Sequence, residues 1–109
     1  MIEIRRYVTR PGKDVVGDWL AALKNVQARA RIAVRIDRIA IGNFGDTKYL
    51  RDGVSELRIH LEPGYRLYYA ILGDTCVLLL CGGEKRKQSS DVNRAIEYFN
   101  DYRERTRKS

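Results

Sequence analysis

The length of the chain, 109 residues, is enough for one hydrophobic core and too short for two. No apolar run is long enough to span a bilayer, and charge begins at Glu3, where a secretion signal would need an apolar segment, so we expect a cytoplasmic protein without a membrane segment. The formal net charge of +7 favours a polyanionic partner if the cations converge in the fold.

Cysteine and histidine usage argues against disulfides and metals. Cys76 and Cys81 fall on one predicted strand with side chains on opposite faces, roughly 16 Å apart, which is too far for a disulfide. We therefore expect buried thiols in a reducing compartment. The sequence has one histidine and no spaced group of Cys, His and Asp, so we expect no metal and no cofactor.

The first part of the chain predicts one strand followed by two helices. Residues 2–8 alternate briefly like a strand, and the turn-forming segment 9–12 ends it. Apolar residues then recur at helical spacing over about 15–25. A second helix is predicted over about 27–41, where Gly42 supplies a left-handed cap.

Basic residues recur on the second predicted helix and just after it. The helix carries a stripe formed by Arg31, Arg35 and Arg38, which is either a solvated face or a ridge that contacts phosphate or a partner. The segment 43–53 contains several helix and strand breakers and predicts a loop. There Lys48, Tyr49 and Arg51 either bind RNA, by charge and base stacking, or only pin the loop.

Residues 54–72 predict a hairpin with one apolar face and one polar face, because apolar and polar side chains alternate along its first strand. A three-residue loop, 62–64, places Ile59 opposite Leu67 and keeps the two faces separate, whereas a two-residue loop mixes them. We therefore predict a surface cluster of four side chains: Arg58, His60, Arg66 and Tyr68.

The remaining chain predicts a buried strand, a basic loop and a helix. Residues 76–81 are continuously apolar, as expected for a central strand covered on both faces. Three cations follow, at 85–87. Ser89 or Ser90 then caps a helix with an apolar face, and the polar tail 103–109 is expected to fray.

Together these elements predict a single α+β domain over residues 1–109, in the order β-α-α-β-β-β-α. Its four-stranded, mostly antiparallel sheet would carry the helices on one face and leave the opposite, concave face open. That open face would carry the predicted surface cluster.

Three segments in this order resemble the RelE/ParE superfamily of bacterial toxins, in particular its HigB-like group of addiction module killer proteins. The segments are 53–59 (GVSELRI), 63–69 (PGYRLYY) and 82–85 (GGEK), and Asp91, Val92 and Ala95 open the last helix in a similar way. The resemblance in element order covers nearly the whole chain and implies a RelE-like fold.

The resemblance also implies a function and partners. RelE-type toxins are ribosome-dependent endoribonucleases that cleave mRNA without a metal and are inhibited by an antitoxin from the same operon. In this group the antitoxin is usually a helix-turn-helix protein, so operator DNA would be contacted only through it. Arg66 matches an arginine that contacts the scissile phosphate, Arg58 and His60 match two basic strand positions, and Lys85 with Arg86 match a basic pair. Val92 stands where RelE enzymes often have Tyr or His.

Metal-free cleavage of RNA needs a base for the 2′-hydroxyl, positive charge for the phosphorane and an acid for the leaving 5′-oxygen. His60 is the natural base, because its unperturbed pKa lies near neutrality. Arg58, Arg66 and Arg86 suit phosphate binding, since a planar guanidinium matches two phosphate oxygens. Lys85 can supply the leaving-group proton.

Each assignment has a simpler alternative. Arg66 either contacts phosphate or forms a salt bridge with Glu56 or Glu62. Tyr68 either stacks on a base or packs in the sheet. The surface that we expect to bind RNA comprises Lys48, Arg51, Arg58, Tyr68 and Lys87. The simpler alternative for residues 85–87 is a solvated loop.

Three functions remain open from the sequence. The first is an mRNA-cleaving toxin, which the basic cluster favours. The second is a ParE-like toxin that inhibits DNA gyrase without nuclease activity. The third is an inactive toxin that still binds its antitoxin; arginines paired off or turned away from the surface would favour it.

Overall fold

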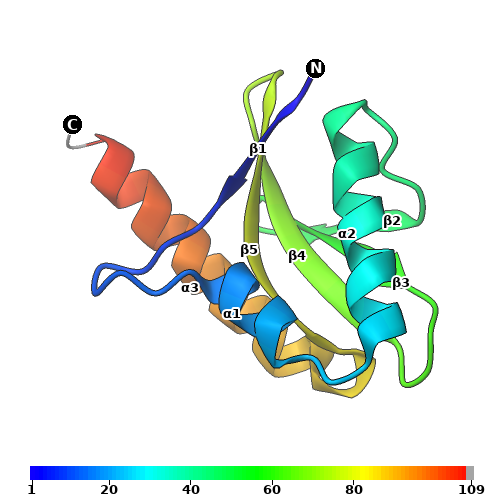
Figure 1. The fold of residues 1–109 in the computed structure, drawn as a ribbon. Helices are drawn as coiled ribbons and strands as arrows, with labels where there is room; N and C mark the ends of the chain where they lie inside the picture. Colours follow the sequence, from blue (N-terminus) through cyan, green and yellow to red (C-terminus); the bar gives the residue numbers. More distant parts are fainter. Residues whose placement is uncertain (108–109) are drawn as a thin grey trace.

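A computed structural model describes residues 1–107 of the chain (Figure 1). Its helices and strands, in chain order, are β1 (Glu3–Arg6), α1 (Val15–Ala22), α2 (Val26–Ala40), β2 (Thr47–Arg51), β3 (Val54–Ile59), β4 (Tyr65–Leu72), β5 (Cys76–Glu84), the 3₁₀ turn η1 (Lys85–Lys87) and α3 (Gln88–Arg107). Within this part of the chain, no helix is both long and apolar enough to cross a membrane.

The strands form a five-stranded sheet in the order β1-β5-β4-β3-β2. β1 runs parallel to β5, and the other neighbours are antiparallel. The predicted α+β class and mostly antiparallel sheet are therefore confirmed. The interior strand β5 is buried from Cys76 to Cys81, as its unbroken apolar run predicts, and both cysteines are free thiols.

The sheet has five strands rather than four, because residues 47–51, which we expected in a loop, form β2. Four of its five residues are exposed, so the sequence shows neither the alternation nor the apolar run of a buried strand. The strand exists because it pairs with β3, which would otherwise present an open edge.

Helices cover both faces of the sheet, whereas we predicted helices on one face only (Figure 1). α3 packs against one face, where Tyr68, Leu78 and Leu80 join its apolar residues. α2 packs against the other face, over Leu57 and Leu67. Strands with apolar side chains on both faces need helices packed against both faces. Helices on one face only would have left the other apolar face exposed to solvent.

The β3–β4 hairpin keeps the predicted faces but has a different register. Leu57, not Ile59, lies opposite Leu67, and Ile59 lies opposite Tyr65. The connection is therefore the five residues 60–64 rather than three. The predicted and observed registers differ by two positions. A shift by an even number of residues leaves every side chain on the same face of the sheet.

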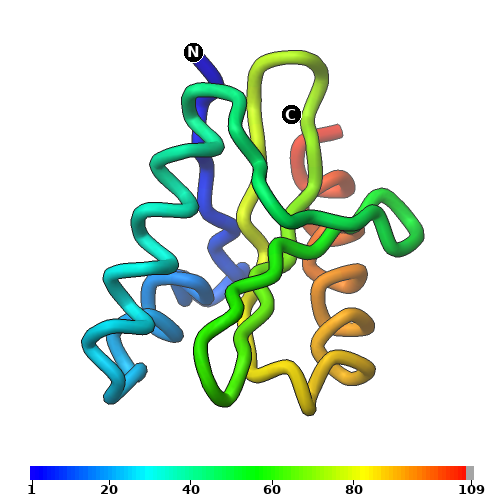
Figure 2. Tube along the Cα trace, turned by 90° about the vertical axis from the view of Figure 1, so that its right-hand side faces the viewer, coloured from blue at the N-terminus to red at the C-terminus, as the bar shows by residue number. Residues whose placement is uncertain are grey.

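α3 starts one residue before the predicted cap, at Gln88, and continues to Arg107. Its buried residues include Val92, Ala95 and Phe99, as its apolar spacing predicts. The expectation of a frayed tail is wrong for residues 103–107, which stay helical, and residues 108–109 lie outside the described part. In Figure 2, α3 begins at the same lower end of the molecule as the connection between β3 and β4. Its first residue is thereby placed beside the polar face of β3.

Candidate functional site

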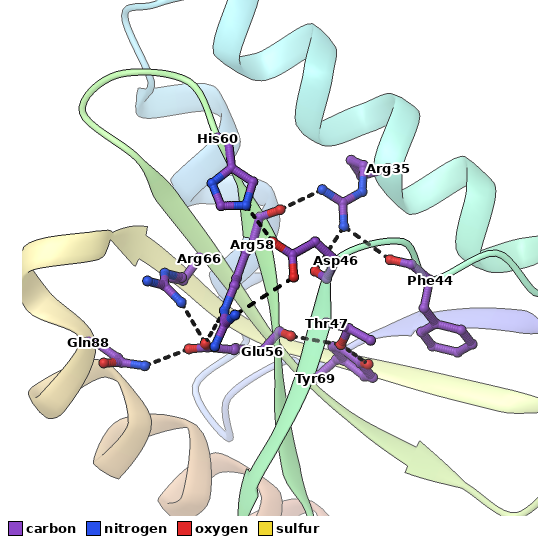
Figure 3. Close-up of polar contacts among 10 residues, drawn as sticks. All are labelled: Arg35, Phe44, Asp46, Thr47, Glu56, Arg58, His60, Arg66, Tyr69 and Gln88. Atoms are coloured by element: carbon purple, nitrogen blue, oxygen red, sulfur yellow. Dashed lines mark hydrogen bonds and ion pairs between the residues drawn. The ribbon is translucent and has the colours of Figure 1, made fainter.

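A buried glutamate, Glu56 on β3, is the centre of the polar cluster (Figure 3). Its side chain is fully buried. One carboxylate oxygen, Oε2, accepts hydrogen bonds from Arg66 Nη1 at 2.5 Å and from Arg58 Nε at 2.8 Å. The other, Oε1, accepts from Gln88 Nε2 at 2.7 Å. We call these four residues the Glu56 cluster.

The strand period brings the Glu56 cluster together. Glu56 and Arg58 are two residues apart on β3, so their side chains share a face. Arg58 lies directly opposite Arg66 on β4. Two arginines in directly opposed positions repel each other, and the carboxylate between them offsets that repulsion. Gln88 arrives from a different element, the first position of α3.

The two arginines are held but not enclosed. The side chain of Arg58 is 31 % exposed and that of Arg66 is 12 % exposed, while each uses only one nitrogen on Glu56. Hydrogen bonding to Glu56 is the main reason that the pKa of Arg58 is raised, so its positive charge is secure. Arg58 therefore offers the larger surface for contact with an anion, whereas Arg66 is mostly buried.

His60 follows β3 and pairs with Asp46 from the segment before β2. Its ring nitrogen Nε2 lies within hydrogen-bonding distance of Asp46 Oδ2, and its side chain is 74 % exposed. Arg58 Nη1 lies 3.8 Å from the other oxygen of Asp46. The hydrogen bond with His60, aided by the charge of Arg58, holds the pKa of Asp46 below its usual value. His60 therefore lies next to the Glu56 cluster, as predicted.

The predicted basic residues after β5 lie at the same end of the sheet, in η1. The backbone N–H of Lys85 donates to the carbonyl of Gly64 at 3.0 Å, in the connection that also carries His60. Arg86 is largely exposed and pairs with Glu84 at 3.3 Å. Lys87 lines a different hollow, beside Trp19. Lys85 is thus the η1 cation with a direct backbone link to the His60 connection.

Lys48 and Arg51 lie on β2, beside the Glu56 cluster. Lys48 is the direct partner of Glu56 across the β2–β3 pair. Arg51 donates to Asn93 on α3 at 2.6 Å and pairs with Asp52 at 3.0 Å. A groove of about 520 Å³ runs between β2 and the start of α3, and both cations line it.

Tyr68 does not belong to the exposed surface, contrary to our prediction. Its side chain is completely buried under α3, and burial raises its pKa. The reason is the observed register, which places Tyr68 opposite Glu56, inside the sheet, rather than opposite Arg58 near its end. Tyr68 is therefore a core residue in this structure and is not available to stack on a base.

Three contributors to the site were not predicted as site residues. Glu56 was considered only as an alternative partner of Arg66, although its period-two spacing from Arg58 already placed both on one face. Asp46 fell in the segment predicted as a loop. Gln88 gave no sequence signal, because only the path of α3 brings it to β3.

Arg35, from the predicted basic stripe of α2, has a structural role at this site. Its guanidinium donates to the backbone carbonyls of Arg58 at 2.5 Å, Phe44 at 3.0 Å and Asp46 at 3.1 Å. Partial burial lowers its pKa. Arg31, Arg35 and Arg38 also line one groove along this helix, so the stripe is continuous. Arg35 differs from the other two because its guanidinium is also bound to the backbone of the site.

The arrangement is suited to binding an oxyanion. Two guanidinium groups face the same region of the surface, with an imidazole beside them and a lysine on the adjoining turn. Such groups bind phosphate by charge-assisted hydrogen bonds. Within residues 1–107, no group of three or more His, Cys, Asp or Glu side chains is placed to hold a metal ion.

Comparison with known proteins identifies a bacterial relative. No protein-family model matches the chain. An uncharacterized protein of Haemophilus influenzae is 48 % identical to it over 77 residues, which cover 71 % of this chain and 78 % of the Haemophilus protein. Identity at this level over most of both chains shows common descent. The chain therefore belongs to the same family as this Haemophilus influenzae protein.

Proposed function

We propose that this protein is a toxin of a type II toxin–antitoxin module, of the RelE/ParE superfamily, and that it cleaves mRNA on translating ribosomes without a metal. One observation carries the proposal. Arg58 and Arg66 are directly opposite each other on adjacent strands, and one buried carboxylate, Glu56, orients both of them. The resemblance of the surrounding motifs to RelE-type toxins supports the same reading.

The burial of Glu56 is easier to understand as orientation than as stabilisation. A buried ion pair is weak evidence for stability, because the cost of desolvating the charges is close to the gain from their attraction. β3 and β4 are already joined by backbone hydrogen bonds, so the sheet does not need this cluster to hold them together. Fixing two guanidinium groups in advance is useful where negative charge develops in a transition state.

The proposed chemistry follows from the positions of the side chains. Arg58 and Arg66 bind the nonbridging oxygens of the scissile phosphate. His60 accepts the proton of the 2′-hydroxyl, and the 2′-oxygen attacks phosphorus. The bond from phosphorus to the 5′-oxygen breaks, and Lys85 gives that oxygen a proton. The products are a 2′,3′-cyclic phosphate and a 5′-hydroxyl, and the reaction would take place in the cytoplasm.

The proposed partners are an mRNA held by a ribosome and a cognate antitoxin, which we expect to be a helix-turn-helix protein. The basic residues Lys48 and Arg51 would extend the contact with RNA along β2. An antitoxin would inhibit the toxin by covering this basic face or by preventing entry into the ribosome.

A second candidate function also has an observation in its favour. Both arginines pair with Glu56, and His60 pairs with Asp46, so the three cationic or titratable groups already have partners. This pattern favours a protein that binds its target or antitoxin without cutting RNA, either a gyrase inhibitor of the ParE type or an inactive toxin.

One experiment separates these functions. Ribosomes translating a defined mRNA are incubated with the wild-type protein, Arg66→Lys or His60→Ala, and new 5′ ends are mapped by primer extension. Arg66→Lys keeps the charge that Glu56 needs but loses the planar fork, so we expect cleavage to fall by about 10²–10³-fold. Arg107→Ala, at the far end of α3, is the matched control and should cleave normally.

The nuclease proposal fails if the wild-type protein leaves the ribosome-bound mRNA intact. Inhibition of gyrase supercoiling under the same conditions would then support the ParE-like function. Absence of both activities, with retained binding of the antitoxin, would support an inactive toxin.

A further inference from the structure

The ring of His60 is attached to the protein through one nitrogen only. Nε2 contacts Asp46 Oδ2, while the side chain as a whole is 74 % exposed (Figure 3). The two nitrogens of histidine are distinct, and the partner of one decides the protonation of the other. A carboxylate at Nε2 accepts a hydrogen bond from the N–H of that nitrogen, so the neutral ring keeps its proton on Nε2 and its lone pair on Nδ1.

The backbone carbonyl of Asp46 is fixed by two hydrogen bonds. Its carbonyl oxygen accepts from the backbone N–H of Arg58 at 3.0 Å and from Arg35 Nη2 at 3.1 Å. Arg35 also donates from Nη1 to the carbonyl of Arg58 at 2.5 Å. One guanidinium on α2 thus ties the segment that carries Asp46 to the strand that leads to His60.

The segment before Asp46 is shaped to admit Arg35. Gly45 has φ of +65°, a conformation that favours glycine, and a Cβ atom at this position would lie 3.1 Å from Arg35 Nη2. Arg35 also donates to the carbonyl of Phe44 at 3.0 Å. The guanidinium is therefore packed against three consecutive residues of the segment, 44–46, and it restricts their movement.

We propose that Asp46 is a positioning residue for His60, that Arg35 fixes Asp46, and that together they present the Nδ1 atom of His60 to the 2′-hydroxyl of the RNA. This inference rests on the proposed nuclease function and deepens it. In the base step the 2′-hydroxyl proton moves to Nδ1, the bond from the 2′-oxygen to phosphorus forms, and the resulting imidazolium charge is offset by the Asp46 carboxylate. The charged groups around this pair are Arg58 on β3 and Arg35 on α2.

The single histidine makes the proposal testable by a direct spectroscopic signature. In protein labelled with ¹⁵N-histidine, long-range ¹H–¹⁵N correlation spectra report which ring nitrogen carries the proton. We expect the neutral wild-type ring to be protonated on Nε2. Asp46→Ala should shift the ring toward a mixture of both tautomers, and Asp46→Glu should restore much of the wild-type signature.

The variants are compared in two further ways. Arg35→Gln should weaken the same signature, because the segment 44–46 is then less restrained. Asp74→Ala, an exposed aspartate in the turn between β4 and β5, is the matched control and should leave the signature unchanged. Backbone amide spectra show whether each variant is folded.

Cleavage on ribosomes provides the functional measurement. A general base contributes about 10²–10⁴-fold to rate, so loss of its orientation in Asp46→Ala should reduce kcat at least about tenfold with little change in KM. The proposal is overturned if Asp46→Ala cleaves at the wild-type rate, or if its ring signature equals that of the wild type. If the wild-type protein does not cleave at all, the nuclease function fails, and the spectra still decide whether Asp46 fixes the ring.

Discussion

Two carboxylates of this protein each hold arginines, near opposite ends of α3, and they differ in burial and in what they connect. Glu56 is fully buried and contacts Arg58 and Arg66, which lie on β3 and β4. Asp101, on α3, is 21 % exposed and pairs with Arg10 at 2.8 Å and Arg105 at 2.9 Å. A carboxylate that pairs with two arginines is thus fully buried in one place and partly exposed in the other.

The Asp101 cluster, which comprises Asp101, Tyr7, Arg10 and Arg105, joins segments that are distant in sequence. Tyr7 and Arg10 come from the N-terminal segment, whereas Asp101 and Arg105 belong to the last helix. Its hydrogen bonds therefore fasten elements that the sheet does not connect directly. Most of the Glu56 cluster lies on strands that are already hydrogen-bonded to each other. We therefore infer that the Asp101 cluster contributes mainly to stability, whereas the Glu56 cluster orients side chains at the proposed site.

The largest expected effect is that of Glu56→Ala. Removing the carboxylate leaves two guanidinium groups opposite each other with no counter-charge, and loss of one partner of a buried ion pair costs about 3–5 kcal/mol. Urea denaturation should show this loss of unfolding free energy. Glu62→Ala, which removes an exposed glutamate nearby, should stay within about 0.5 kcal/mol of the wild type. If Glu56→Ala lost less than about 1 kcal/mol of unfolding free energy, the Glu56 carboxylate would not be needed to offset the repulsion between Arg58 and Arg66.

Gln88→Ala tests the link between α3 and the Glu56 cluster. The change leaves Oε1 of the buried carboxylate without its donor, which should cost about 1–3 kcal/mol of unfolding free energy. The same denaturation measurement applies. Ser89→Ala, at the adjacent exposed position, is the control and should have little effect. Equal stabilities of the two variants would show that Glu56 does not depend on the helix.

Tyr7→Phe tests the Asp101 cluster, and we expect a smaller effect. The change removes one hydroxyl that donates to Asp101 and keeps the ring, so the unfolding free energy should fall by about 1 kcal/mol. Tyr98→Phe is the matched control, because its ring stacks on Tyr7 at 4.7 Å. A loss no larger than that of Tyr98→Phe would mean that the hydrogen bond from Tyr7 to Asp101 does not contribute to stability.

The smallest expected effect is a change in acid stability. Hydrogen bonds from Tyr7 and Arg10 lower the pKa of Asp101, and the hydrogen bond with His60 lowers that of Asp46. A carboxyl group whose pKa is lower in the folded state adds stability above its unfolded pKa, here 3.8 for both groups, and this contribution is lost as the pH falls through the folded value.

Thermal unfolding between pH 2 and pH 6 checks this effect. The wild-type midpoint should fall steeply below about pH 4. Asp101→Asn and Asp46→Asn should each show a shallower fall, with a lower starting value near pH 6. If both variants follow the wild-type slope, neither carboxylate is preferentially ionised in the folded protein.

The fold was predictable where side-chain spacing carried the information. The unbroken apolar run at 76–81 indicated a buried strand, and Val92, Ala95 and Phe99 indicated the covered face of the last helix. The strand β2 was not predictable in this way, because its exposed residues have no apolar pattern and it forms only by pairing with β3. The hairpin register was missed by two positions because both registers keep the same faces.

The candidate site was predictable to the same extent. Arg58, His60 and Arg66 were placed at one end of the polar face by alternation alone, and the structure brings them close together. Tyr68 lies on the same face but is buried. Whether α3 covers a residue depends on its position along the strand as well as on the face that it occupies. Asp46, Arg35 and Gln88, which contact His60, Arg58 and Glu56 respectively, come from three other segments.

By itself, the sequence determined the periodic features of this protein: which strand faces are apolar, where helices run and which cations share a face. These follow from the geometry of the backbone, which repeats every two residues in a strand and every 3.6 in a helix. Only the tertiary structure decided how the charges pair, that helices cover both faces and that Glu56 is buried. Contacts between distant segments depend on how the elements pack, and no local spacing encodes that packing.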